Sequence, residues 1–192
     1  AKLWETYKLD SITGGWDYFE PALFGYAAGK IIESFYEFNL SGLDRIVAQF
    51  HEWMTGTGIL YIEKSAPWIA TAFTTHATVL GRCIAGNNRP LYGRMKDYIP
   101  AQASREFNVV AKQSLEKISA SEADVFTTVS GITSKECSLF LGKEVDIVTP
   151  NGFDDFFVPT ADLFEQKRSQ AREKLKRVAE AVLGYPLSDN CL

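Results

Sequence analysis

The sequence lacks several features that would assign it to a specialised class of protein. No run of about 18 apolar residues occurs, so no segment is expected to span a membrane. The formal net charge of −4 argues against a protein whose main task is to neutralise nucleic-acid phosphates. Cys83, Cys137 and Cys191 are too few and too far apart for a disulfide framework, which favours a reducing compartment. These absences leave a cytoplasmic enzyme or binding domain.

The familiar catalytic and phosphate-binding motifs are also missing. There is no GxSxG, no GxxxxGK[ST], no GxGxxG after a predicted strand, no HExxH and no pair of CxxC motifs. His51, His76 and Glu52 could form a metal site of two histidines and one carboxylate, but their spacing matches no known metal motif. Cys83 and Cys137 have no histidine beside them, so ordinary packing is the better interpretation. The sequence therefore predicts neither a metal nor a cofactor.

What the sequence does contain is an alternation of strand and helix patterns. Short apolar runs rich in β-branched and aromatic residues alternate with stretches of helical period, which is typical of βαβ units. We therefore expect an α/β fold with a three-layer, Rossmann-like, open and mostly parallel sheet. The expected strands are residues 45–50, 68–74, 125–129 and 145–149. The expected helices are residues 19–38, 53–63, 104–119 and 131–141, with a closing helix capped by Thr160 and ended by Gly184, while residues 81–103 form a long loop or broken helix.

Polar residues follow the predicted strands, at the edge where open parallel sheets bind ligands. The chain has two histidines, and both follow strands: His51 the first and His76 the second. Either can be an ordinary structural histidine. Two imidazoles facing one crevice favour a site that hydrogen-bonds a hydroxyl, stabilises a developing negative charge or takes a proton. Ser130 opens a helix whose N–H groups can meet an anion, although a plain helix start explains it equally well.

Four segments resemble, in order and spacing, the glycogen synthases of the animal and fungal type. They are residues 49–56 (QFHEWMTG), 73–82 (FTTHATVLGR), 125–133 (VFTTVSGIT) and 146–152 (DIVTPNG). The resemblance extends from residues 3–6 to residue 155, and more loosely beyond. It implies a GT-B glycosyltransferase, in which two Rossmann-like domains face each other across a cleft. Residues 1–159 would be the latter part of the N-terminal, acceptor-side domain, and residues 160–192 a closing amphipathic helix leading to a C-terminal domain.

The same resemblance implies an activity and a set of site residues. Members of the family transfer glucose from UDP-glucose, or ADP-glucose, to the 4-hydroxyl of an α-1,4-glucan, with retention of configuration and without a metal. The expected partners are the nucleotide-sugar donor, the glucan acceptor and the C-terminal domain, with a possible homo-oligomer in the longer protein. His51 is the expected catalytic residue, lying against the transferred glucose. The expected substrate-binding residues are Glu52, Trp53, Thr75, His76, Ser130, Asn151 and Gly152.

The chain also departs from the family pattern. It lacks the glycine-rich Lys-x-Gly-Gly loop, the Arg/Lys pair and glutamate motif that grip the donor, and the arginine-rich helix that senses glucose 6-phosphate. Glu63 replaces an arginine of the animal sequences, and residues 83–103 diverge from them. We therefore expect a fragment that transfers no glucose by itself. The alternatives are a catalytically inert carbohydrate-binding or oligomerisation module, and a related transferase with another donor.

Overall fold

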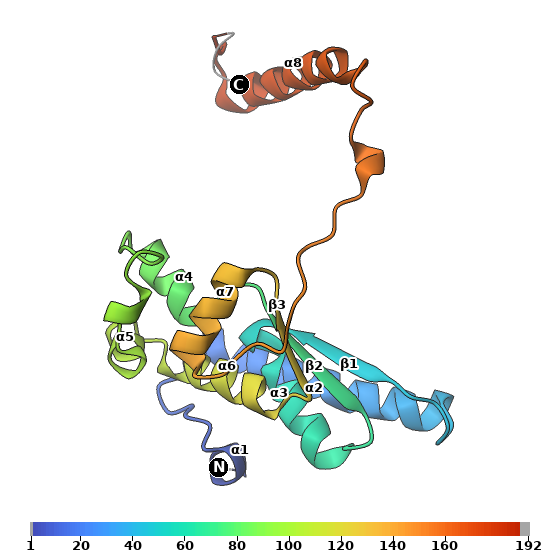
Figure 1. The fold of residues 1–192 in the computed structure, drawn as a ribbon, viewed down its shortest axis with the longest axis vertical. Helices are drawn as coiled ribbons and strands as arrows, with labels where there is room; N and C mark the ends of the chain where they lie inside the picture. Colours follow the sequence, from blue (N-terminus) through green and yellow to red (C-terminus); the bar gives the residue numbers. More distant parts are fainter. Residues whose placement is uncertain (1, 189–192) are drawn as a thin grey trace. The chain divides into compact units, whose positions relative to one another are not determined.

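A computed structural model describes residues 2–188 of the chain, and Cys191 lies outside them. In these residues, short strands alternate with helices (Figure 1). The α-helices are α1 (Lys2–Tyr7), α2 (Trp16–Asn39), α3 (Glu52–Ser65), α4 (Val79–Gly86), α5 (Pro100–Glu106), α6 (Val110–Glu122), α7 (Gly131–Glu136) and α8 (Phe164–Leu183). The strands are β1 (Val47–His51), β2 (Ala70–Thr75), β3 (Val125–Thr128) and β4 (Ile147–Val148). Three short turns of helix complete the list: η1 (Met95–Asp97) and η3 (Asp155–Phe157) are 3₁₀ turns, and η2 (Cys137–Leu141) is a π turn that continues α7.

The four strands form one parallel sheet in the order β1-β2-β3-β4. Phe50, Phe73 and Phe126 are aligned across the three longer strands. The predicted open parallel α/β sheet is therefore confirmed. Strand β4 is shorter than expected, and the N–H of Thr149 prolongs its edge by donating to the carbonyl oxygen of Thr128 at 2.7 Å.

The main core lies on the face of the sheet that carries these three phenylalanines. All three are buried, and Ile59 and Ile62 of α3 pack with them. On the opposite face of β1, Val47, Gln49 and His51 are exposed. Because parallel strands alternate their side chains, this pattern leaves His51 accessible.

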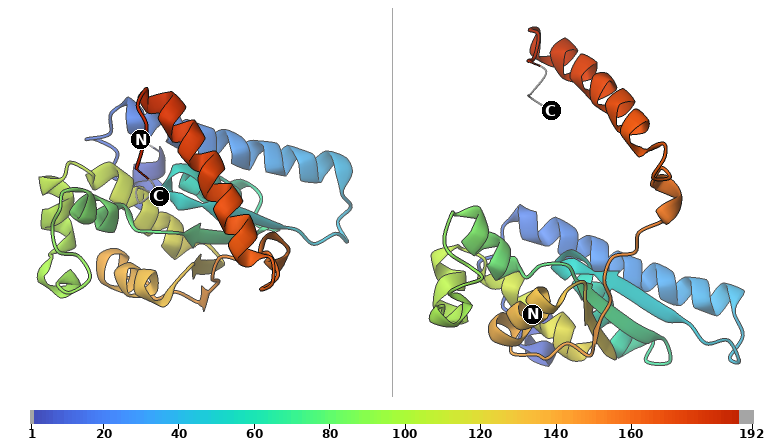
Figure 2. Two further views of the ribbon diagram at one scale, coloured as in Figure 1. Left: turned by 90° about the horizontal axis from the view of Figure 1, so that it is seen from above. Right: turned by 45° about the horizontal axis from the view of Figure 1, so that its top comes forward.

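Helix α3 packs closely on the long α2, which runs beside the strands in both views of Figure 2. A Cβ at Gly58 would collide with the ring of Phe50 and lie 2.7 Å from the carbonyl oxygen of Gly25. The absence of a side chain at Gly58 thus lets α3 approach both β1 and α2. Close packing here fixes the start of α3, where the candidate site begins.

Two details of the helices differ from expectation. Instead of one helix over residues 104–119, the chain forms α5 and α6, separated at Asn108, whose φ is +55°. Asparagine tolerates this left-handed conformation, so the helix ends there without glycine. The broken-helix interpretation of residues 81–103 is confirmed, because α4, η1 and the start of α5 occupy the segment.

The chain divides into two compact units, residues 1–150 and 151–192. The domain boundary expected at residue 159 stays a prediction. In the second unit, Gly184 ends α8 with φ at +76°, as predicted. The prediction that Thr160 caps this helix is wrong: the capping position is Leu163, whose N–H donates to the carbonyl oxygen of Thr160 at 2.9 Å without a side-chain cap.

Candidate functional site

The two histidines of the chain meet at the carboxyl ends of neighbouring strands. His51 is the last residue of β1, and His76 directly follows β2. Their imidazoles are 3.1 Å apart between Nδ1 of His51 and Nε2 of His76, and the ring centroids are 5.3 Å apart. At this distance one nitrogen donates and the other accepts, so a single hydrogen is shared and the remaining ring nitrogens are left for a ligand. His51 is exposed and His76 is half-buried.

Glu52 connects the two strand ends through its side chain. Its Oε1 accepts from the backbone N–H of His76 at 3.1 Å and from Nη2 of Arg82 at 3.1 Å. The Glu52 backbone has φ at +63°, in the left-handed region that side chains rarely adopt. Such strain persists where the surroundings fix the residue, and it is concentrated at functional sites. Here the two hydrogen bonds hold the strained residue directly after His51.

Buried carboxyl groups hold the turn that carries His76. Oε1 of Glu116 accepts from the hydroxyl of Thr75 at 3.0 Å, and Oε2 accepts from the N–H of Val79 at 3.0 Å. Oε2 of Glu136 accepts from the hydroxyl of Thr78 at 2.9 Å. The Thr78 oxygen itself caps α4 by accepting from an N–H of its first turn. The turn is therefore fixed on both sides of His76.

The electrostatics of these carboxyl groups follow from their burial. Glu116 is fully buried, and burial raises the pKa of its carboxyl to about 8 from an ordinary 4.5. The nearby charges of Glu52 and Glu136 add to this rise, while the hydrogen bonds from Val79 and Thr75 oppose it. Burial likewise raises the pKa of Glu136, against the opposing effects of Thr78 and Arg82. Glu116 is therefore mainly a neutral acid at pH 7.

The structure places the other predicted site residues in different surroundings. Trp53 is half-buried, with its ring stacked on Tyr18 at 6.0 Å and Nζ of Lys112 5.4 Å from its centroid. Ser130 caps α7 by accepting from the N–H of Thr133 at 3.1 Å. Asn151 and Gly152 belong to the second unit, so their part in the site stays a prediction.

Sequence reasoning missed Glu116, Glu136 and Arg82 as parts of this arrangement. The first two are acidic residues on helices next to lysine or cysteine, a pattern that normally indicates a solvent-facing side chain. The position of Glu116 on its helix could have indicated burial, because Glu116 shares a helix face with Ser119 and Ala120, both of which are buried. Charged residues on a face of small residues indicate burial against a partner.

The cysteines do not add reactive groups to the site. Cys83 is half-buried and Cys137 is buried, and neither is in a disulfide. Burial raises the pKa of both thiols, which keeps them protonated. Among residues 2–188, no group of three or more His, Cys, Asp or Glu side chains is arranged to hold a metal ion.

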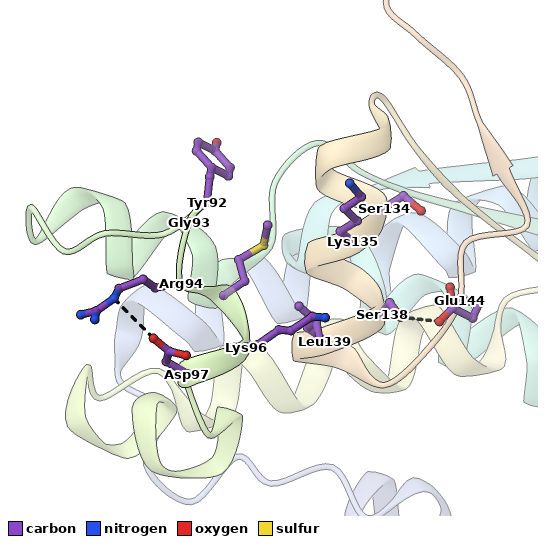
Figure 3. A pocket seen from close by; sticks show the side chains of 11 residues that line it. Tyr92, Gly93, Arg94, Lys96, Asp97, Ser134, Lys135, Ser138, Leu139 and Glu144 are labelled. Carbon is purple, nitrogen blue, oxygen red and sulfur yellow. Dashed lines mark hydrogen bonds and ion pairs between the residues drawn. The ribbon is translucent and has the colours of Figure 1, made fainter.

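A cavity of about 590 Å³ lies apart from the predicted site residues, none of which lines it. It lies between the segment around η1, including Tyr92 and Lys96, and α7–η2, including Lys135 (Figure 3). Two of the residues that line the cavity form an ion pair, with Nε of Arg94 3.4 Å from Oδ2 of Asp97. The 81–103 segment thus contributes one wall of the cavity.

A parallel sheet with polar side chains gathered at its carboxyl edge is the layout of a ligand-binding α/β domain. The family model described as glycogen synthase matches residues 1–185. The chain belongs to the glycogen synthase family. In the part of the chain that the structure describes, no helix is both long and apolar enough to cross a membrane.

Individual relatives agree with this assignment. The chain is 35% identical to glycogen [starch] synthase of Dictyostelium discoideum over 133 residues, 69% of this chain and 15% of that protein. It is 31% identical to the Caenorhabditis elegans glycogen [starch] synthase over 159 residues, 82% of this chain and 24% of that protein. The liver glycogen [starch] synthase of Mus musculus is 39% identical over 109 residues, 57% of this chain and 16% of that protein. The chain therefore spans less than a quarter of the length of these relatives.

Proposed function

We propose that this chain is the acceptor-side part of a retaining glucosyltransferase, and that its histidine pair orients the glucose being transferred. The observation that carries the proposal is the 3.1 Å contact between His51 and His76 at the carboxyl edge of a sheet in a glycogen synthase family member. Both imidazoles keep one ring nitrogen outside this contact. Those nitrogens are suited to hydrogen-bond sugar hydroxyls, which are both donors and acceptors.

The proposed chemistry assigns orientation rather than proton transfer to His51. Retaining glucosyl transfer develops positive charge on the sugar ring and negative charge on the departing diphosphate. Groups on the sugar side therefore need to hold hydroxyls in place, while cations elsewhere hold the phosphates. His51, oriented by its contact with His76, supplies such a fixed hydrogen-bonding group on the sugar side.

Glu52 and Thr75 support this role from the two strand ends. Glu52 holds the backbone of His76, and Thr75 is buried against Glu116. The donor is proposed to be UDP-glucose, or ADP-glucose, and the acceptor the 4-hydroxyl of an α-1,4-glucan. A C-terminal domain is proposed to supply the cations for the diphosphate, and a second copy of the longer protein is proposed as a further partner. The free Cys83 and Cys137 support a cytoplasmic location.

Transfer of labelled glucose from UDP-glucose to glycogen tests the proposal. The longer protein that we expect to contain this chain should transfer glucose, and the chain alone should not. His51→Ala in the longer protein should lower the rate by about 100-fold or more, the usual effect of removing one oriented hydrogen-bonding group. The matched control is Gln49→Ala, because Gln49 is exposed on the same face of β1, two residues earlier.

Three outcomes would contradict parts of the proposal. Elongation of glycogen by the chain alone would show that no further domain is needed. Near-native transfer by the His51→Ala protein would remove His51 from the mechanism. Binding of glucan by the longer protein without any transfer would favour an inert carbohydrate-binding module.

A further inference from the structure

Two carboxyl groups buried beside the candidate site have no part in the chemistry proposed above. Glu116 projects from α6 and Glu136 from α7, and both are at most 2% exposed. Among residues 2–188, neither has a lysine or arginine within ion-pairing distance. Because burying an unpaired carboxyl is costly, its presence in a folded core calls for a compensating role.

Both carboxyl groups bind the same short turn. Glu116 reaches the residue before His76, through the Thr75 hydroxyl, and the residue three positions after it, through the Val79 N–H. Glu136 reaches Thr78, two positions after His76. The two acceptors of Glu116 belong to one rigid planar group, so they fix the separation between the end of β2 and the start of α4.

The first turn of α4 packs tightly against the Glu136 carboxyl group. A Cβ at Gly81 would lie 2.8 Å from Oγ1 of Thr78 and would collide with the Glu136 carboxyl group. The first turn of α4 therefore approaches Glu136 only because residue 81 has no side chain. Every buried side-chain polar atom of the described residues has a hydrogen-bond partner, so the cluster is fully satisfied.

We propose that Glu116 and Glu136 are positioning residues that hold the His76 turn so that its imidazole meets His51. The positioning itself stands on the geometry above, and its consequence for sugar transfer rests on the proposed function. The cluster acts through hydrogen bonds rather than charge. When Glu116 carries its proton, it donates to Thr75 Oγ1, and the hydroxyl of Thr75 then donates to the carbonyl oxygen of Ala77, 3.4 Å away.

If Glu116 acts through hydrogen bonds, its replacement by glutamine should have a smaller effect than its replacement by an apolar residue. The side chain of glutamine has the shape of a protonated glutamic acid, with one donor end and one carbonyl oxygen. Glu116→Gln should therefore keep both contacts. Glu116→Leu fills the same space but leaves the Val79 N–H and the Thr75 hydroxyl without this partner. If Glu116 only filled space, leucine would be tolerated as well as glutamine.

The experiment is nitrogen-detected NMR of the histidine side chains, recorded on the 192-residue chain without any sugar. Only two histidines occur, so the imidazole signals are assigned by His51→Asn and His76→Asn variants. We expect Glu116→Gln to keep the wild-type imidazole shifts of both histidines within the line width. Glu116→Leu and Glu136→Leu should move the signals of both rings together, because their shared hydrogen bond is lost.

The matched control is Asp124→Asn, because Asp124 precedes β3 and its side chain binds Thr71, at the end of β2 opposite to His76. Asp124 accepts from the N–H of Thr71 at 2.7 Å, so this change weakens β2 away from the histidines and should leave both imidazole signals in place. If Glu116→Leu fails to fold, Glu116→Asp takes its place, since a side chain one methylene shorter cannot span the two partners. Unchanged imidazole shifts in a folded Glu116→Leu or Glu116→Asp protein would overturn the proposal.

These spectra also distinguish the proposal from the function on which it draws. Coupled histidine shifts in the carboxyl variants, with no glucose transfer by the longer protein, would support the positioning and contradict the transferase. Transfer that depends on His51 but is equal in Glu116→Leu and wild type, with unmoved shifts, would support the transferase and contradict the positioning.

Discussion

The two edges of the sheet use acidic side chains in different ways. At the amino edge, Asp124 and Asp146 are exposed and accept from the backbone N–H groups of Thr71 and Phe126, both at 2.7 Å. Each aspartate precedes one strand and binds the start of the strand before it. These carboxylates fasten neighbouring strands to each other while remaining in contact with water.

At the carboxyl edge the acids are buried and bind a turn rather than the next strand. Glu116 and Glu136 come from helices and converge on the segment that carries His76. The same carboxyl group thus joins neighbouring strands where it is hydrated, and holds the turn that carries a site side chain where it is buried. Loss of an acid should therefore have different consequences at the two edges.

The largest effect on stability is expected at the carboxyl edge. Glu116→Ala leaves buried partners unsatisfied and should lower the free energy of unfolding by about 1–3 kcal/mol, the usual cost of an unpaired buried group. Glu116→Gln should cost less than this, because the amide replaces the acid in the same contacts. Urea denaturation at pH 6 measures both variants. Equal losses in the two variants would contradict a role in hydrogen bonding.

The pH dependence of stability should also come from the carboxyl edge. The Glu116 pKa is raised from 4.5 to about 8, so the folded chain binds a proton that the unfolded chain releases. The stabilising contribution is therefore complete below pH 4.5 and is lost as the pH rises toward 8, with a slope of at most about 1.4 kcal/mol per pH unit.

Glu116→Gln provides the comparison for this pH effect, because glutamine does not titrate. The difference in unfolding free energy between wild type and this variant should move in favour of the variant from pH 5 to pH 8. Urea denaturation across this range measures it. A difference that stays constant would show that Glu116 is ionised throughout.

A smaller effect is expected at the amino edge. Asp124→Ala should lower the free energy of unfolding by about 1 kcal/mol, because the N–H and hydroxyl of the buried Thr71 lose their shared acceptor on the exposed Asp124. The imidazole signals should not change. Displaced histidine signals in this variant would show that the two edges are not independent.

The smallest effect is expected for the ion pair between Arg82 and Glu52. The Arg82 side chain is 60% exposed, and exposed pairs contribute about 0–1 kcal/mol. Arg82→Ala should therefore change the free energy of unfolding by no more than this. The difference between the variant and wild type should be smaller in about 0.5 M salt than in low salt, because salt screens exposed charges. A large loss that salt does not reduce would assign Arg82 a buried role.

The sequence predicts elements that rest on a repeated pattern, and it fails where a single residue or contact decides where a helix begins or ends. Runs such as residues 68–74 consist of apolar, aromatic or β-branched residues at every position, so the strands, and with them the positions of His51 and His76, were predictable. The break at Asn108 depends on a single residue with positive φ, in a stretch whose apolar spacing continues across it. The missing side-chain cap at Leu163 is another local choice that composition does not fix.

The buried acids were not predictable for a different reason. A glutamate followed by lysine, as at Glu116, normally belongs on a solvated helix face, and only tertiary packing brings it to Thr75, 41 positions away in sequence. The hydrogen bond between the histidines likewise joins residues 25 positions apart. Their common edge follows from the topology, whereas their contact depends on the turn geometry that the buried acids fix.

The carboxyl edge holds His51 and His76 in one shared hydrogen bond, and nitrogen NMR can detect that bond directly. A scalar coupling between Nδ1 of His51 and Nε2 of His76, measured across the hydrogen in the ¹⁵N-labelled chain, is the result we predict. Two imidazoles that exchange freely between tautomers, with no coupling at any temperature at which the chain is folded, would contradict it.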